Sequence, residues 1–228
     1  MQKRKALIIF FKWPRPGSVK TRLVPFLTHE EAAQLYEKFV LDSFETVIKL
    51  RQVDLFGYVA SDAEEAHSLR AKLDAMSVKI RSQRGQGLGE RMSNAFKEIF
   101  ELGYASVAIV GTDSPDLPIS YIEVAFQSLD MANSALCIGP SEDGGYYLLG
   151  MNRFFRQVFQ GVPYSSSETY RETLRALVPL SLSVFPLRQW YDVDEKKDLI
   201  KLMKTMKDGE LRNSRQLLES LKVRVGLG

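Results

Sequence analysis

The sequence is poor in the residues that build disulfides and structural zinc sites. It has one cysteine, Cys137, and two histidines, His29 and His67, among 228 residues. A single cysteine excludes an internal disulfide, and so few sulfur and imidazole ligands exclude a structural zinc site. Cys137 lies in the apolar run 135–138, so we expect a buried, unreactive thiol. Both histidines lie in polar, helix-like stretches, and we place neither in a functional site.

The chain also lacks a large excess of charge and a long apolar run. The formal net charge is only +3, with acidic and basic residues mixed along the chain, which gives no support for nucleic-acid binding through bulk electrostatics. The apolar stretch after the basic N-terminus ends at Lys12 and is too short for a signal peptide or a membrane span. We therefore expect a cytoplasmic protein with no nucleic-acid partner. The oligomeric state is not readable from the sequence.

The composition is that of a globular protein, with 45% hydrophobic and 26% charged residues and a length that fits one domain over residues 1–228. Apolar, β-branched runs predict strands at 6–11, 53–60, 78–82, 105–110, 135–139, 146–150 and 182–186. Helical spacing predicts helices at 29–50 with Thr28 as N-cap, 62–75 with Asp62 as N-cap, 90–102, 120–130, 169–177, from 195 onward, and 214–221.

The alternation of these strands and helices predicts an α/β fold with three layers, in which helices cover both faces of a mostly parallel, Rossmann-like sheet. The predicted strands 135–139 and 146–150 are separated by too few residues for a crossover helix. They cannot be a parallel pair, so we expect a mixed sheet.

The stretch 111–118 (GTDSPDLP) is the most informative part of the chain. It follows the apolar run 105–110, typical of a strand buried on both faces, and its two prolines turn the chain out of the sheet. Asp113 therefore lies at the carboxyl end of a central strand, where open α/β sheets bind ligands. It could hold Mg²⁺ or Mn²⁺ with substrate phosphates, or serve only as a turn residue. For Asp116, between the prolines, we expect a loop or helix-entry role.

A basic loop follows the first predicted strand and contains Pro16, Gly17, Lys20 and Arg22. Glycine lets a backbone approach a ligand closely, and lysine and arginine supply the charge and the geometry to bind phosphate oxygens. The loop is not a Walker A motif, because the glycines of that motif are missing. A solvated loop with incidental charge is the alternative, and we favour phosphate binding.

Two glycine-rich turns are further candidates. Residues 85–89 (GQGLG) lead into a helix start, whose free N–H groups attract anions or polar base edges, although glycine also serves ordinary turns. In the second turn, Gly144 and Gly145 follow Asp143. These glycines could place backbone beside a bound group while Asp143 accepts hydrogen bonds from the hydroxyls of a sugar or polyol. An ordinary Asp-Gly hairpin turn is an equal alternative.

The last candidate is the segment Asp192-Val193-Asp194, directly before the predicted helix from residue 195. Aspartates two residues apart point to the same side of an extended chain. We expect Asp194 to cap the following helix, which leaves Asp192 as the better candidate for a metal ligand.

Taken in order, five stretches resemble the nucleotide-diphospho-sugar transferase superfamily, which has the GT-A-type Rossmann-like fold. They read FFKWPRPGSVKTRL, GLGERMSNAF, GTDSPDLP, GPSEDGGYYLLG and YDVDEKKDL, and they cover about residues 5–200. The match is to a group of small bacterial glycosyltransferase-like proteins that also forms a domain-of-unknown-function family. Phospholactate guanylyltransferase and the molybdenum-cofactor nucleotidyltransferases are related.

The resemblance implies that Lys20 and Arg22 contact nucleotide phosphates, in the loop that begins at Pro16 and Gly17. It implies that Asp113 is the principal ligand of Mg²⁺ or Mn²⁺, and that Asp192 or Asp194 is a second.

The resemblance also assigns the remaining parts of the site. Gly87, Leu88 and Gly89 would border the base or ribose, and the turn from Asp143 through Gly144 and Gly145 to Tyr146 would border the sugar or acceptor. The implied catalytic residues are Asp113, Lys20, Arg22 and Asp143. The general base is not identified, and Asp143 and Glu142 are its candidates.

The implied activity is metal-dependent transfer of a sugar from a nucleotide sugar to an unidentified small-molecule acceptor. Nucleotidyl transfer with release of pyrophosphate is the first alternative. The basic loop argues against it, because it lacks the Gly-x-Gly-Thr-Arg form usual in sugar nucleotidyltransferases. The late segment also departs from the Asp-x-Asp-Thr-Pro pattern of many relatives, which leaves the second metal position open. A non-catalytic nucleotide-sugar sensor is the third possibility.

Overall fold

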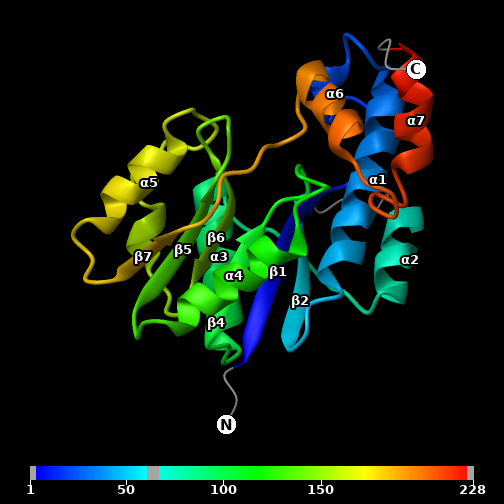
Figure 1. Ribbon diagram of the computed structural model, residues 1–228. Coiled ribbons are helices and arrows are strands. Elements are labelled where there is room, and N and C mark those ends of the chain that lie inside the picture. Colours follow the sequence, from blue (N-terminus) through cyan, green and yellow to red (C-terminus); the bar gives the residue numbers. More distant parts are fainter. Residues whose placement is uncertain (1–3, 61–66, 225–228) are drawn as a thin grey trace.

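The computed structural model describes residues 4–60 and 67–224, which are built around one sheet of seven strands (Figure 1). In spatial order β3-β2-β1-β4-β6-β5-β7, every strand is parallel to the others except β6. The strands are β1 (Lys5–Lys12), β2 (Val53–Ala60), β3 (Lys79–Ser82), β4 (Ser106–Val110), β5 (Ala135–Pro140), β6 (Tyr146–Met151) and β7 (Ser183–Pro186). The predicted α/β class and the mixed sheet are confirmed.

The helices also lie near their predicted positions. They are α1 (His29–Val47), α2 (His67–Ala75), α3 (Leu88–Glu101), α4 (Ile119–Asp130), α5 (Thr169–Leu177), α6 (Lys196–Thr205) and α7 (Arg215–Arg224), with short 3-10 helices η1 (Thr21–Leu23) and η2 (Arg156–Phe159). Thr28 is the N-cap of α1 as predicted, in a capping box with Glu31 that satisfies two backbone N–H groups. The proposed cap Asp62 lies outside the described residues.

Alternation along β1 places apolar side chains on both faces of the sheet. Leu7 and Ile9 face one core with α1, α2 and α4, whereas Ala6 and Ile8 face a second core with α3, α5 and η2. All four side chains are fully buried, and burying a leucine or isoleucine stabilises the fold by about 1.5–3 kcal/mol. These two cores make the sheet a rigid base for whatever lies at the strand ends.

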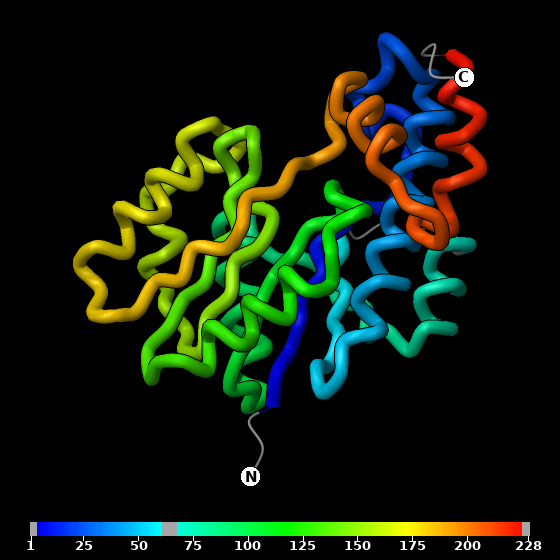
Figure 2. Tube along the Cα trace, in the orientation of Figure 1, coloured from blue at the N-terminus to red at the C-terminus, as the bar shows by residue number. Residues whose placement is uncertain are grey.

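A third apolar cluster joins the C-terminal helices to the basic loop. Residues of α6 and α7 pack on α1, and Leu23 of η1 is buried among them. Between β7 and α6 the chain crosses the molecule in an extended conformation (Figure 2). This crossing segment brings Asp192 and Asp194 to the carboxyl ends of β1 and β4.

Among the described residues, no helix is both long enough and apolar enough to cross a bilayer.

Candidate functional site

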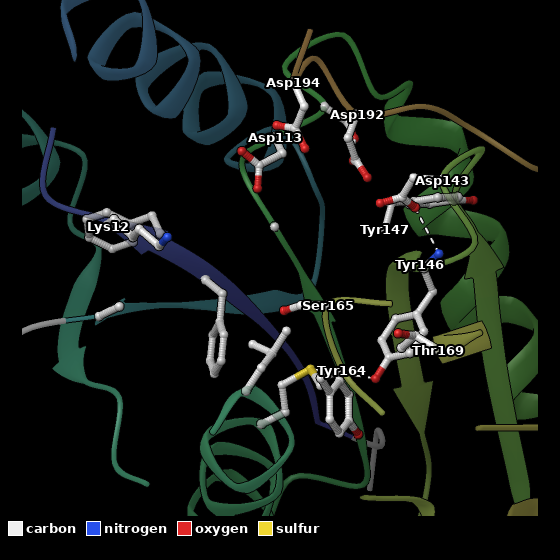
Figure 3. A pocket seen from close by; sticks show the side chains of 18 of the residues that line it. Lys12, Asp113, Asp143, Tyr146, Tyr147, Tyr164, Ser165, Thr169, Asp192 and Asp194 are labelled. Carbon is white, nitrogen blue, oxygen red and sulfur yellow. Dashed lines mark hydrogen bonds between the residues drawn. The ribbon is translucent and has the colours of Figure 1, made fainter. Parts of the chain in front are cut away.

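A pocket of about 940 Å³ lies at the carboxyl ends of β1 and β4 (Figure 3). After β1 the chain continues to its neighbour β2, whereas β4 pairs on the other side of β1. The order of the strands therefore reverses here, and open α/β sheets bind ligands at such a switch point. The pocket is lined by the loop after β1, the start of α3, the loop after β4, the β5–β6 turn, residues 164–167 with Thr169, and the crossing segment.

Lys20 joins three of these segments. Its backbone has a left-handed φ of 47°, and its side chain is only 2% exposed. The Nζ atom donates hydrogen bonds to Oδ1 of Asp113 and, at 2.9 Å, to Oδ1 of Asp194. Three residues that are far apart in the sequence thus meet around one buried ammonium group.

The two carboxylates keep this ammonium charged. Burial acts to lower the pKa of Lys20, but the charges of Asp113 and Asp194 outweigh it and raise the pKa above the usual value. Burial acts in the opposite sense on Asp113, and the Lys20 ammonium, with a smaller contribution from Lys12, holds the pKa of Asp113 below its usual value. The site therefore presents fixed charges of both signs at neutral pH.

Asp113 has the position that the sequence predicts, at the end of the central strand. Its side chain is 51% exposed, and it lines the pocket. Its backbone carbonyl accepts a hydrogen bond from the N–H of Val193 at 2.8 Å, which ties the loop to the crossing segment. The Asp113 carboxylate thus both faces the open pocket and accepts a hydrogen bond from Lys20, which lies 93 positions away in the sequence.

The structure distinguishes Asp192 from Asp194. Both oxygens of Asp192 accept hydrogen bonds at 2.7 Å, from the hydroxyls of Ser114 and Ser141. Burial and the nearby charge of Asp113 raise the pKa of Asp192 to about 6. Asp194, not Asp192, shares the Lys20 ammonium with Asp113.

The prediction that Asp194 caps α6 is wrong. Glu195 is the N-cap and forms a capping box with Asp198. Glu195 can replace an aspartate here because Oδ2 of Asp198 accepts a hydrogen bond from the backbone N–H of Glu195 at 2.8 Å. This arrangement leaves the Asp194 side chain available to Lys20.

Asp116 ties the loop after β4 to the crossing segment. Its carboxylate accepts hydrogen bonds from Nε1 of Trp190 at 3.3 Å and from the hydroxyl of Tyr191 at 2.5 Å. The sequence allowed either a loop role or a helix-entry role for Asp116. Because the N-cap of α4 is Pro118, Asp116 has the loop role.

The remaining residues of the basic loop lie at the rim of the pocket or outside it. Arg22 lines the pocket, is 64% exposed and forms an ion pair with Glu195. Pro16 and Gly17 do not line it. The φ of +77° at Gly17 is one that glycine adopts readily, so this glycine shapes the turn.

The glycines of the predicted binding turns have two different roles. Gly87, Leu88 and Gly145 line the pocket, whereas Gly89 and Gly144 do not. A Cβ at Gly89 would overlap the ring of Tyr164, and a Cβ at Gly144 would overlap the carbonyl of Ser167. Gly89 and Gly144 therefore make room for neighbouring parts of the pocket wall.

Of the two candidate bases, only Asp143 lines the pocket. The turn connects the antiparallel strands β5 and β6, as the alternative of a hairpin turn requires, and one oxygen of Asp143 accepts a hydrogen bond from the N–H of Gly145 at 2.8 Å. The side chain faces the pocket all the same (Figure 3). Glu142 instead forms an ion pair with Lys201 at 2.7 Å.

Sequence reasoning missed several residues of the pocket wall. Lys12 ends β1, and Arg91 lies on the first turn of α3, where its Nε donates to the carbonyl of Gly85 at 3.2 Å. Tyr164 and residues 165–167 also line the pocket. A basic residue at the end of the first strand was a usable signal for Lys12, whereas no pattern in the sequence connects residues 164–167 with the strand ends.

Asp113 and Asp194 could hold a divalent ion if substrate phosphates supply its other ligands. Their oxygens converge on one ammonium nitrogen, and one or two carboxylates are enough for Mg²⁺ that also binds phosphates. Within residues 4–60 and 67–224, no group of three or more histidine, cysteine, aspartate or glutamate side chains could hold a metal by itself.

Comparison with known proteins agrees with this geometry. A provisionally assigned nucleotide-diphospho-sugar transferase from Desulfovibrio desulfuricans G20 superimposes with a TM-score of 0.87 and 32% identity, covering 98% of this chain and 97% of that one. A 4-diphosphocytidyl-2C-methyl-D-erythritol synthase from Anaerococcus prevotii DSM 20548 shares the fold alone. Its TM-score is 0.54 and its identity 10%, over 87% of this chain and 94% of that one.

Sequence comparison identifies a nucleotidyltransferase relative and the family. A 2-phospho-L-lactate guanylyltransferase from Methanocaldococcus vulcanius is 30% identical over 134 residues, 58% of this chain and 55% of the relative. The match spans about half of that relative's length. The predicted likeness to nucleotide-diphospho-sugar transferases is thus confirmed. Residues 45–166 match the family described as "Uncharacterized protein conserved in bacteria (DUF2064)", and the chain belongs to this family.

Proposed function

We propose that the chain is a glycosyltransferase-like enzyme that binds a nucleotide sugar together with Mg²⁺ or Mn²⁺ and transfers the sugar to a small-molecule acceptor. The observation that carries the proposal is the convergence of Lys20, Asp113 and Asp194 at the switch point of the sheet. A buried ammonium beside two carboxylates, in a pocket large enough for a nucleotide sugar, suits a diphosphate bound with a divalent ion.

The basic residues would bind and orient the diphosphate. Lys20 and Arg22 reach it from the loop after β1, and Lys12 and Arg91 add charge from β1 and α3. Asp113 and Asp194 would hold the divalent ion. When bound, the ion would neutralise charge that develops on the leaving nucleoside diphosphate.

Asp143 is our candidate for the proton acceptor. In the proposed step an acceptor hydroxyl oxygen forms a bond to the anomeric carbon, and the bond from that carbon to the diphosphate oxygen breaks. The nucleoside diphosphate leaves with the bonding electrons, and the hydroxyl proton passes to the Asp143 carboxylate. Atoms and charge balance without a further reactant.

Nucleotidyl transfer is the second candidate, and the 30% identity with a guanylyltransferase favours it. Phosphorus NMR of the full chain with Mn²⁺ separates the two reactions: nucleotide sugars yield nucleoside diphosphate in glycosyl transfer, and nucleoside triphosphates yield pyrophosphate in nucleotidyl transfer. Ligand binding without either product, across a broad acceptor panel, would overturn both proposals and leave a sensor.

The metal assignment has its own test. A ligand at about a hundred times its dissociation constant adds about 2.7 kcal/mol to the free energy of unfolding. We expect Asp113→Asn to lose the part of this gain that depends on Mn²⁺, as measured by thermal shift with nucleotide sugars. Glu142→Gln, outside the pocket, is the matched control and should keep it. An unchanged shift in Asp113→Asn would remove Asp113 from the metal site.

A further inference from the structure

Positive charge is distributed unevenly around the pocket. In the described part of the chain, four cationic residues line it, namely Lys12, Lys20, Arg22 and Arg91. They come from the end of β1, the loop after it, and the start of α3. We call these four residues the basic wall.

The other side of the pocket has a different composition. It is formed by Asp143, Tyr146, Tyr147, Tyr164, residues 165–167 and Thr169, which we call the hydroxyl wall. Figure 3 shows Lys12 on the opposite side of the pocket from Asp143, Tyr146 and Tyr147. Within the described residues, the hydroxyl wall has no lysine or arginine, and its one charged group is a carboxylate.

Two cations near the hydroxyl wall form ion pairs outside the pocket. Arg171 forms ion pairs with Glu168 and Glu172, and Lys201 forms one with Glu142. Neither cation lines the pocket. A ligand phosphate at the hydroxyl wall would therefore meet no lysine or arginine among the residues that line it.

Packing holds the hydroxyl wall in place before a ligand arrives. The hydroxyl of Tyr147 donates to the carbonyl of Arg188 at 2.8 Å, and the hydroxyl of Thr169 donates to the carbonyl of Pro163 at 2.8 Å. The Tyr164 ring rests on Gly89, which has no side chain to displace it. The N–H of Tyr170 donates to the carbonyl of Gly144 at 2.9 Å, so the start of α5 is attached to the β5–β6 turn.

We propose that the hydroxyl wall binds an uncharged, hydroxyl-rich molecule, of the sugar or polyol class, and rejects its phosphorylated counterpart. The inference deepens the proposed function and rests on it for the identity of this molecule as the second substrate. A phosphate would be desolvated beside Asp143 with no cation to balance it, and such an unpaired charge discriminates strongly between ligands. A neutral polyol instead donates hydrogen bonds to Asp143 and to the serine hydroxyls, and its C–H faces pack on tyrosine rings.

Binding of matched probes tests the inference without requiring turnover. The probes are glycerol against glycerol 3-phosphate and D-glucose against D-glucose 6-phosphate. Each is titrated into the full chain, carrying ¹³C-labelled tyrosine, with GDP and Mg²⁺ present to occupy the basic wall. We expect the ring signals of Tyr146 and Tyr164 to shift with the neutral member of each pair. The phosphorylated member should bind at least about tenfold more weakly, a difference of 1.4 kcal/mol.

A charge-introducing variant should reverse the preference. Ser165 lies in the hydroxyl wall and already has a left-handed φ of 61°. Ser165→Arg therefore adds a cation to this wall without adding new backbone strain. We expect it to bind the phosphorylated probes more tightly than the neutral ones. Ser77→Arg is the matched control, because Ser77 has a φ of 58° and is exposed outside the pocket. It should keep the wild-type preference.

The outcomes separate this inference from the proposed function. Equal or tighter binding of the phosphorylated probes by the wild-type chain would overturn the inference, and so would the absence of any tyrosine shift with the neutral probes. If GDP, UDP, ADP, CDP and TDP all fail to bind in the presence of Mg²⁺ or Mn²⁺, the proposed function fails. The same titrations without nucleotide then still decide whether the hydroxyl wall prefers neutral ligands.

Discussion

The basic wall and the hydroxyl wall share one pocket but are held in place by different forces. Lys20, at the centre of the basic wall, is fixed by charge, because its ammonium lies between two carboxylates. The hydroxyl wall is held by uncharged contacts, namely hydrogen bonds to backbone carbonyls and the close packing of Tyr164 and Ser167 in space that Gly89 and Gly144 leave open. A substitution can therefore damage one wall and leave the other intact, and each of the following predictions uses this difference.

The largest effect on stability is expected at Gly144. Its φ is +90°, and an added Cβ would overlap the backbone of Ser167, so Gly144→Ala should lower the free energy of unfolding by about 3 kcal/mol. Gly161→Ala is the control. Gly161 has a φ of +71° with no atom near an added Cβ, so only about 1 kcal/mol of strain is expected there. Urea unfolding measures both, and equal losses would contradict the shape argument.

Loss of the positive charge at Lys20 should have the second-largest effect on the free energy of unfolding. Lys20→Met leaves two carboxylates facing each other. Since Asp113 is half exposed, water softens the loss, and we expect about 2 kcal/mol in the free energy of unfolding. Nucleotide affinity should fall at least about tenfold by calorimetry, with neutral-probe binding unchanged. Arg22→Met is the control. Its side chain is 64% exposed, so its effect on stability should stay within about 0.5 kcal/mol.

Gly89 tests the contact between α3 and the hydroxyl wall. Gly89→Ala should cost about 1 kcal/mol because the Tyr164 ring must move. In a Tyr164→Ala background the sign should reverse, since alanine is favoured over glycine inside a helix by about 0.5–1 kcal/mol. Gly87→Ala, with no atom near its added Cβ, is the control. Thermal unfolding of the four proteins completes a double-mutant cycle, and a missing sign change would refute the packing role.

The smallest effect concerns Asp192, between the two walls. Its pKa is raised from 3.8 to about 6, so the folded state favours the protonated form. The stability that this preference provides is present below pH 3.8 and is lost as the pH rises through about 6. We therefore expect Asp192→Asn to melt a few degrees above wild type at pH 8, with the difference shrinking toward pH 4. Asp194→Asn, which loses a partner of Lys20, should melt below wild type at pH 8. A gap for Asp192→Asn that widens on acidification would contradict the assignment.

Apolar periodicity accounts for how well the elements were predicted. The predicted and observed positions of strands and helices agree because the spacing of apolar residues in each buried segment, such as 105–110, reflects which of its faces are buried. The prediction for Asp113 has the same basis: a buried strand that is followed by Gly111 and, four residues later, by Pro115 must leave the sheet between them, where Asp113 lies. The helix cap at Asp194 was wrong because two carboxylates stand side by side at positions 194 and 195. Only the position of Lys20 assigns one to the pocket and the other to the helix.

The α/β class, the mixed sheet, the basic loop and the aspartate at the end of the central strand were all predictable from the sequence, because each depends on residues close together in the chain. Packing in three dimensions sets which carboxylates surround Lys20, places Asp192 between two serine hydroxyls, and brings residues 164–167 and Thr169 to the pocket. Those contacts join segments up to 174 positions apart. Their geometry depends on how helices and loops pack on the sheet, and no local pattern of side chains records it.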